Sequence, residues 1–119
     1  MKKVCINSYG DSSCLEISEL ILNTPLASND IKISVKATSI NPIDVMKREG
    51  YGKSIFEKQR KELFPWILGT DVAGTILEIG DNVTRFNIGQ DVWGSSTNPN
   101  RGTYCDVAFF HEDELDIKP

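Results

Sequence analysis

The sequence predicts one mainly β, barrel-like domain over residues 1–119, with two short helical insertions. Apolar runs of strand length recur along the chain, separated by clusters of Gly, Pro, Asn and Ser that are typical of turns. Residues 31–39 carry the clearest alternation of apolar and polar side chains, as expected of a strand with one buried face. Helix initiation signals stand at residues 41 and 54.

The first third of the chain reads as strands joined by turns. Residues 3–9 and 14–20 are predicted to form a hairpin around the turn cluster at residues 10–13. Residues 23–30 are rich in turn formers and predict a loop, which leads into the strand at residues 31–39.

Two short helices are expected next. Asn41 is a good N-cap, Pro42 suits the first helical position and Asp44 complements the helix dipole, so a helix is predicted from Pro42 to about Glu49, ending at Gly50. Ser54 and Glu57 have the spacing of a capping box, which predicts a second helix through about Leu63.

The remainder is again predicted as strands. Residues 64–80 form an apolar stretch interrupted by glycines, where we expect the backbone to bend or to approach another backbone closely. Short strands are predicted at residues 92–93 and 102–110, on either side of a polar loop at residues 95–102, and a weaker exit strand at residues 112–119.

Composition narrows the classes of partner and compartment. The net charge is −4 with Lys and Arg scattered, so we expect no nucleic acid partner. No apolar run long enough for a transmembrane helix occurs. Neither a signal peptide nor a presequence is visible, so we expect the cytoplasm or the mitochondrial matrix. The three cysteines are predicted to be reduced thiols.

Few residues could carry chemistry alone. The single histidine, His111, has no second histidine or cysteine cluster with metal-ligand spacing, and we expect it to be a surface residue at a strand end. No glycine-rich phosphate-binding motif occurs. Polar residues at strand-to-helix junctions remain, namely Asn41, Asp44 and Asp71. Helix capping and dipole stabilisation explain Asn41 and Asp44 equally well.

The order of motifs resembles the N-terminal GroES-like domain of the zinc-free quinone oxidoreductases in the medium-chain dehydrogenase/reductase superfamily. The reticulon-interacting mitochondrial branch is the most similar, because of its turn at residues 50–52 and the charged insert before Phe64. The matching segments, in order, are residues 35–45, 48–52, 64–74, 79–89, 91–94 and 102–104.

This resemblance implies a parent enzyme that uses NADPH to reduce a small quinone or enone. A Rossmann domain, absent here, would follow residue 119 and hold the cofactor, so we expect this chain alone to bind no cofactor and to be inactive. The family leaves open a homodimer of the parent. The resemblance places six residues at the substrate and cofactor pocket: Asn41, Asp44, Met46, Tyr51, Thr70 and Asp71.

Several of these residues have specific implied roles. Asn41 would face the pocket, Asp44 would brace its turn, and Tyr51 would lie near the cleft. Met46 stands where several members have a tyrosine. Zinc-dependent relatives carry Cys in place of Asn41 and a His-Glu pair in place of Thr70 and Asp71, so we expect no zinc.

Two alternatives are carried forward. The chain could be a non-catalytic interaction module that exposes apolar surface around residues 107–110. A co-chaperonin shares the barrel, but the loop at residues 23–30 is short and polar, whereas a co-chaperonin requires an apolar mobile loop.

Overall fold

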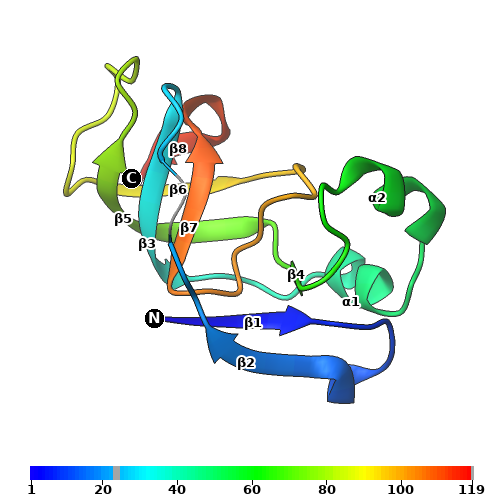
Figure 1. Ribbon diagram of the computed structural model, residues 1–119. Coiled ribbons are helices and arrows are strands. Elements are labelled where there is room, and N and C mark those ends of the chain that lie inside the picture. The colour runs from blue at the N-terminus through cyan, green and yellow to red at the C-terminus, as the bar shows by residue number, and fades with distance from the viewer. Residues whose placement is uncertain (23–24, 119) are drawn as a thin grey trace.

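The computed structural model describes residues 1–22 and 25–118, and these form a mainly β domain with two short α-helices, as predicted (Figure 1). The strands are β1 Lys2–Ile6, β2 Leu15–Glu19, β3 Asp30–Ala37, β4 Trp66–Ile67, β5 Asp71–Ile79, β6 Asp91–Ser95, β7 Val107–His111 and β8 Leu115–Ile117. The helices are α1 Pro42–Arg48 and α2 Lys53–Gln59, and single 3-10 turns cover Ser12–Cys14 and Glu112–Glu114.

Five antiparallel strands form the larger sheet in the order β7-β3-β5-β6-β8. The alternation in β3 is confirmed: Ile31 and Ile33 are fully buried, while the intervening Lys32 is half-buried. Their cluster, hereafter the large core, contains Ile31, Ile33, Val72, Ile76, Val83, Phe86, Val92, Ala108, Phe110 and Leu115. Each fully buried Ile or Phe contributes about 1.5–3 kcal/mol, so this sheet carries much of the stability.

The smaller sheet contains three strands in the order β2-β1-β4, and β1 and β2 form the predicted hairpin. Ile6, Trp66 and Leu68 are buried beside it, with Tyr9, Cys14, Phe56, Phe64 and Tyr104 packed around them, and together they form the small core. The two sheets are separate ladders that do not close into one barrel, which fits the predicted partly open fold.

The first half of β1 is attached to a segment late in the chain. The Val4 amide donates to the Tyr104 carbonyl oxygen at 2.7 Å, and the Lys2 amide donates to Asp106 Oδ2 at 2.6 Å. Lys3 and Cys105 form an isolated antiparallel bridge between these two contacts. Residues 104–106 therefore join the hairpin to the larger sheet.

Helix α1 begins and ends as predicted, but the prediction for α2 was wrong at both ends. Gly52, not Ser54, precedes the helix, and it has a positive φ of 72°. The amides of Ile55 and Phe56 donate to the Gly52 carbonyl, so the helix is already under way at Ser54. The helix stops before Arg60, whose guanidinium bonds the carbonyls of Leu63, Pro65 and Pro99, so the chain up to Leu63 forms a cap and not a further turn.

Other boundaries need correction near the C-terminal end. Strand β7 begins at Val107, and residues 102–106 form only the isolated bridge, because their amides donate to Lys2 and Leu68 in other segments. Val107, Ala108 and Phe110 are buried, so residues 107–110 do not expose the apolar surface expected of an interaction module. Residues 23–24 of the predicted loop and residue 119 of the exit strand lie outside the described residues.

Within the ranges that the structure describes, no helix is long and apolar enough to span a membrane.

Candidate functional site

Two chain segments that are distant in sequence meet beside the larger sheet. One runs from the end of β3 to the start of α1, and the other is the start of β5 (Figure 1). Asn41 directly precedes α1, and Asp71 is the first residue of β5. Because β3 and β5 are antiparallel neighbours, residues just past the end of β3 lie next to the beginning of β5.

Asp71 is the acceptor at the centre of this meeting point. Its Oδ2 accepts hydrogen bonds from Ser39 Oγ at 2.6 Å and from Asn41 Nδ2 at 2.8 Å. The side-chain Nδ2 of Asn41 also donates to Ser39 Oγ at 3.4 Å. The Ser39 bond, followed by the Asn41 bond, lowers the pKa of Asp71 below its usual value, so the carboxylate is ionised at neutral pH.

Asp44 holds the backbone on both sides of the site. It is only 2% exposed, and its two carboxylate oxygens accept from separate segments. Oδ2 accepts from the backbone N–H of Asn41 at 2.9 Å, and Oδ1 accepts from the backbone N–H of Gly69 at 3.1 Å. Gly69 has a φ of +100°, which favours glycine, so the turn before Thr70 and Asp71 depends on both its residue type and its bond to Asp44.

Thr103 was not singled out from the sequence, yet it belongs to this network. Thr38 Oγ1 donates to the Asp71 carbonyl at 2.7 Å and lies 2.7 Å from Thr103 Oγ1, so the Thr103 hydroxyl donates to Thr38. The Thr103 side chain is 1% exposed and lies over Gly69, at the place where a Cβ would stand. A threonine near the start of a predicted strand carries no sign of such a contact.

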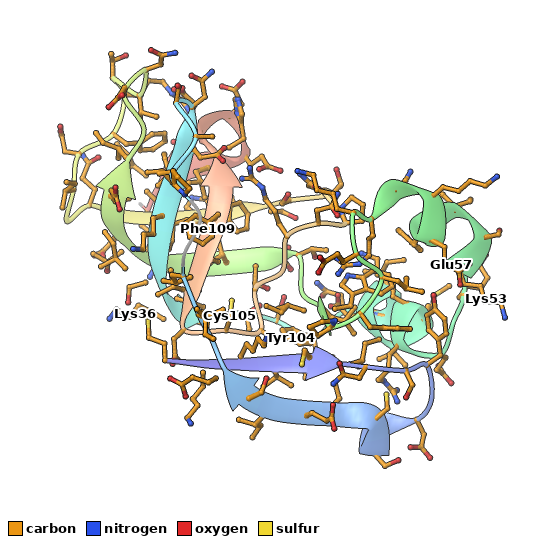
Figure 2. The ribbon with its side chains drawn as sticks, viewed as in Figure 1. Lys36, Lys53, Glu57, Tyr104, Cys105 and Phe109 are labelled. Atoms are coloured by element: carbon orange, nitrogen blue, oxygen red, sulfur yellow. The ribbon has the colours of Figure 1, made fainter. Side chains whose placement is uncertain are left out.

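Tyr104 lies at the seam between the hairpin and the larger sheet (Figure 2). Its hydroxyl is buried and, among the described residues, makes no hydrogen bond. Burial, followed by the negative charge of Asp44, raises the pKa of Tyr104 well above its ordinary value. Tyr104 is therefore a neutral phenol close to the Asp44 carboxylate.

The other predicted pocket residues lie at varying distances from Asp71. Thr70 is its chain neighbour and is half-buried, and its carbonyl accepts from the Ser96 amide at 2.9 Å. Met46 is half-buried within α1, and Tyr51 is exposed in the link between the helices. No hydrogen bond within the described ranges joins the side chain of Met46 or Tyr51 to the Asp71 cluster.

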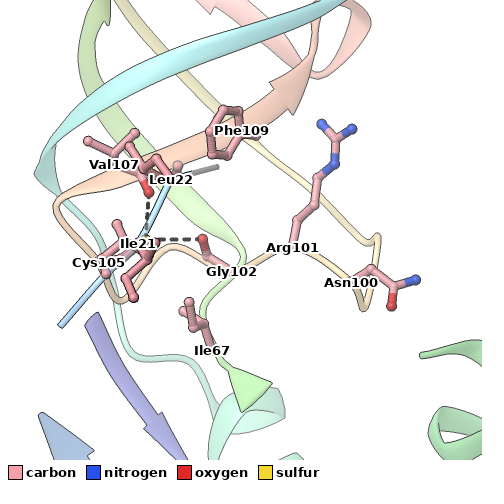
Figure 3. Close-up of a pocket in the computed structure, with 11 residues that line it drawn as sticks. Ile21, Leu22, Ile67, Asn100, Arg101, Gly102, Cys105, Val107 and Phe109 are labelled. Atoms are coloured by element: carbon pink, nitrogen blue, oxygen red, sulfur yellow. Dashed lines mark hydrogen bonds between the residues drawn. The ribbon is translucent and has the colours of Figure 1, made fainter. Parts of the chain in front are cut away.

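A groove of about 420 Å³ opens beside Asp71. Thr38 and Ser39 line one side, Asp71 and Ala73 form part of the floor, and Trp93 stands opposite. A second cavity, of about 190 Å³, lies between residues 20–22 and β7 and is lined by none of the six predicted site residues (Figure 3). There the Cys105 thiol donates to the Val107 carbonyl at 3.1 Å, and burial raises its pKa to about 11, so this thiol is not a reactive group.

The donor set does not form a metal site in the described parts of the chain. No group of three or more His, Cys, Asp or Glu side chains comes together there, and all three cysteines are free thiols. His111 ends β7, where its Nδ1 accepts from the Asp113 amide at 3.1 Å. Its observed role is to cap the Glu112–Glu114 turn at the strand end, where we expected it.

Comparison with known proteins identifies the same fold and family. The family model "Alcohol dehydrogenase GroES-like domain" matches residues 27–115. The mitochondrial NAD(P)H oxidoreductase RTN4IP1 of Dictyostelium discoideum is 36% identical and covers 100% of this chain with 34% of its own length. The human protein of that name is 32% identical and covers 96% of this chain with 31% of its own length. The chain thus spans about a third of the length of the curated relatives it matches.

Solved structures agree over the whole chain. The quinone oxidoreductase of Coxiella burnetii superposes with a TM-score of 0.88 at 29% identity, covering 100% of this chain and 37% of that protein. The Escherichia coli quinone oxidoreductase complexed with NADPH gives a TM-score of 0.85 at 25% identity, covering 100% and 33%. The chain belongs to the alcohol dehydrogenase GroES-like domain family, within the quinone oxidoreductase type of the medium-chain dehydrogenase/reductase superfamily.

Proposed function

We propose that this chain is the substrate-side domain of an NADPH-dependent, zinc-independent reductase of small quinones or enones. The observation that carries the proposal is the hydrogen bond between Asn41 Nδ2 and Asp71 Oδ2 at the wall of the groove. It fixes the Asp71 carboxylate, which lines the groove, against Asn41, which is 30 positions earlier in the chain, and the groove beside Asp71 has a size suited to a small ring. Relatives named as NAD(P)H and quinone oxidoreductases support the reaction type.

The cofactor is assigned to a second domain of the whole protein. All strand pairings in the described residues are antiparallel, whereas a dinucleotide fold needs parallel strands joined through helices and a glycine-rich turn. The described residues therefore do not fit NADPH by themselves. We expect the 119-residue chain to be inactive alone, because reduction requires the nicotinamide to be held against its acceptor.

We base zinc independence on the hydrogen bonds of Asn41 and Asp71, the positions at which zinc-dependent relatives carry metal ligands. Asn41 and Asp71 bond each other, and Asp71 also accepts from Ser39, so both side chains are already engaged. An amide is a poor zinc ligand beside thiolate or imidazole. Chelation of trace metal with EDTA should leave the turnover of the whole protein unchanged, and a loss of turnover would contradict this part of the proposal.

The decisive experiment compares this chain with a chain extended through its downstream domain. NADPH oxidation with a small quinone is followed by the absorbance of the reduced nicotinamide. Turnover is expected only for the extended protein, and Asp71→Asn or Asn41→Ala should lower its kcat/KM by about tenfold or more, as the loss of a positioning hydrogen bond does. Glu78→Gln, at the other end of β5, is the matched control and should change little. Turnover by the short chain, or none by the extended one, would contradict the proposal.

Location and assembly are also proposals. The relatives from Dictyostelium discoideum and human are named as mitochondrial proteins, so we place the parent protein in mitochondria. Imaging of the full-length protein with a C-terminal fluorescent tag tests this. Sedimentation of the purified protein tests whether it forms the homodimer that the resemblance leaves open.

A further inference from the structure

Another groove, of about 500 Å³, lies between the N-terminal hairpin and the end of β3 (Figure 2). This hairpin groove is lined by residues 2–4 of β1, by the end of β3 with the residues that follow it, and by residues 103–106. None of the six predicted site residues lines it. It shares Ala37 and Thr38 with the groove beside Asp71, so the end of β3 borders both grooves.

The hairpin groove has an apolar wall that is partly left in water. Val4 and Leu15 contribute apolar side chains from the hairpin, and Val35 and Ile40 contribute them from the chain around the end of β3. Ile40 is 76% exposed and Leu15 is 38% exposed. Single exposed apolar side chains are common, whereas these two line one concave surface. A ligand that covers them is favoured in proportion to the apolar area that it removes from water.

The charged side chains of the hairpin groove are mainly lysines. Lys2, Lys3 and Lys36 line it together with one acidic residue, Asp106. The Lys2 ammonium is paired with Glu19 at 3.1 Å, and Asp106 Oδ2 accepts from the Lys2 backbone N–H at 2.6 Å. Among the described residues, no ion pair reaches Lys3 or Lys36. In a chain whose net charge is −4, this groove therefore keeps two ammonium groups for an anion.

Backbone contacts bring these two lysines to the same place. Lys3 forms the isolated bridge with Cys105, and the backbone N–H of Val35, which precedes Lys36, donates to the Asp106 carbonyl at 2.9 Å. Both lysines are thus next to the same two-residue segment, and both line the groove. Their four-carbon side chains are flexible, so both ammonium groups can reach one anion.

The combination of apolar wall and lysines narrows the class of ligand. A small inorganic anion would leave Leu15 and Ile40 exposed, and a neutral apolar molecule would leave both ammonium groups unpaired. A cationic ligand would meet like charge. A volume of about 500 Å³ is in the range of grooves that hold a small molecule.

We propose that the hairpin groove binds a medium-chain carboxylate. Its alkyl chain lies against Leu15 and Ile40, and its carboxylate accepts hydrogen bonds from the ammonium groups of Lys3 and Lys36. The groove beside Asp71 would repel the same ligand, because Asp71 is its only charged lining residue among those described. This site is separate from the proposed reduction, which concerns the groove beside Asp71.

The test uses the isotope-labelled 119-residue chain and two probes with the same alkyl chain. Chemical shifts are followed by NMR at neutral pH during titration with hexanoate and with 1-hexanol, which has no charge. We expect saturable shifts at the Leu15 and Ile40 methyl groups, with hexanoate binding about fivefold more tightly, because two exposed ion pairs each contribute little. Salt at about 0.5 M should reduce this preference. Equal binding of the two probes, or a preference that salt leaves unchanged, would overturn the inference.

Variants separate the apolar wall from the lysines. Lys3→Gln combined with Lys36→Gln should reduce the preference for hexanoate to less than about twofold. Ile40→Ser should weaken both probes while preserving the preference. Lys53→Gln combined with Lys58→Gln removes two exposed lysines of α2 and is the matched control. An unchanged preference in the first double variant, with a spectrum that retains the native dispersion, would refute the assigned contacts.

Two further measurements test the place of binding and the source of the anion. Saturable hexanoate shifts at the Trp93 indole N–H, with none at Ile40, would place the ligand beside Asp71 and overturn the assignment. The chain should sedimentedly associate no more with phosphatidylglycerol vesicles than with neutral phosphatidylcholine vesicles. Greater sedimentation with the anionic vesicles, lost in Lys3→Gln combined with Lys36→Gln, would mean that this surface binds a membrane, which contradicts a free carboxylate ligand.

Discussion

The large core and the small core are assembled by different means. The large core is mainly aliphatic, and its members come from the five paired strands of the larger sheet and, in Val83 and Phe86, from the connection between β5 and β6. The small core is mainly aromatic: Tyr9 meets Phe64 edge-on at 5.2 Å, and Phe56 lies 5.5 Å from Trp66. Only Ile6 of β1, Trp66 of β4 and Phe56 of α2 come from strands or α-helices, and its other members lie in turns and connections.

The site lies where the two cores meet, and there hydrogen bonds replace apolar packing. Asp44 belongs to α1 on the side of the small core, while Asp71 begins a strand of the large core. The contacts between them run through the Asn41 and Gly69 amides and through the hydroxyls of Thr38 and Thr103. Because hydrogen bonds are directional, they fix the position of α1 relative to the start of β5 even though each bond contributes little to stability.

The largest effect is expected in the large core. Phe110→Ala removes a side chain that is 1% exposed and should lower the free energy of unfolding by about 3–5 kcal/mol. Urea unfolding measures this loss. Ile88→Ala, at an exposed position, is the control and should stay within about 0.5 kcal/mol. A loss below about 1 kcal/mol for Phe110→Ala would show that the large core does not dominate stability.

The second-largest effect on stability is expected at the junction between the two cores. Asp44→Ala leaves the partly buried Asn41 backbone N–H and the buried Gly69 backbone N–H without their acceptor and should cost about 2–4 kcal/mol. Faster hydrogen exchange at the Gly69 amide should accompany the loss. Asp106→Ala removes an exposed carboxylate that accepts from the Lys2 amide, and it should cost less than about 1 kcal/mol. Equal losses of unfolding free energy in the two variants would mean that hydrogen bonds at the junction contribute no more to stability than an exposed one.

A smaller effect is expected from the threonine pair. Thr103→Val preserves the shape of the side chain but removes the donor to Thr38, and it should cost about 1 kcal/mol. The exposed Thr84→Val serves as the matched control. If Thr103→Val were as stable as the wild type, packing over Gly69, and not the hydroxyl, would be the contribution of this residue.

The smallest expected effect concerns charge. Ser39→Ala removes the largest cause of the lowered pKa of Asp71, so that pKa should rise toward its ordinary value of about 3.9. A lowered folded-state pKa stabilises the domain above the unfolded value, and this contribution is lost as the pH falls through the folded value. Carboxyl resonances followed by NMR give both pKa values. An unchanged Asp71 pKa in Ser39→Ala would remove Ser39 from the network.

Much of the fold could be predicted because its signals are local. The alternation in β3 and the Asn41-Pro42 helix start depend on neighbouring residues, and both are confirmed. The Ser54 capping signal is also local, but the preceding Gly52 turn had already started the helix. Residues 102–106 have the composition of a strand, yet their backbone partners belong to Leu68, to β1 and to Val35 of β3, which no local pattern reveals.

The candidate site could be predicted only in part. Asn41, Asp44 and Asp71 stand at element junctions, and the sequence shows this. Their hydrogen bonds depend on the register of β3 against β5, which shifts between Val35 and Ala37. Trp93 was predicted only as part of a short strand, because its exposure depends on small neighbours in β3 and β5.

The attachment of β1 to residues 104–106 bears on how the protein is made. At translation rates of about 5–20 residues per second, the N-terminal strand waits about 5–20 s before the Tyr104 and Asp106 acceptors are synthesised. Until then Lys2 and Val4 lack their late partners, and β3 lacks β7. We therefore expect the nascent domain to depend on chaperone protection until its last strands emerge from the ribosome.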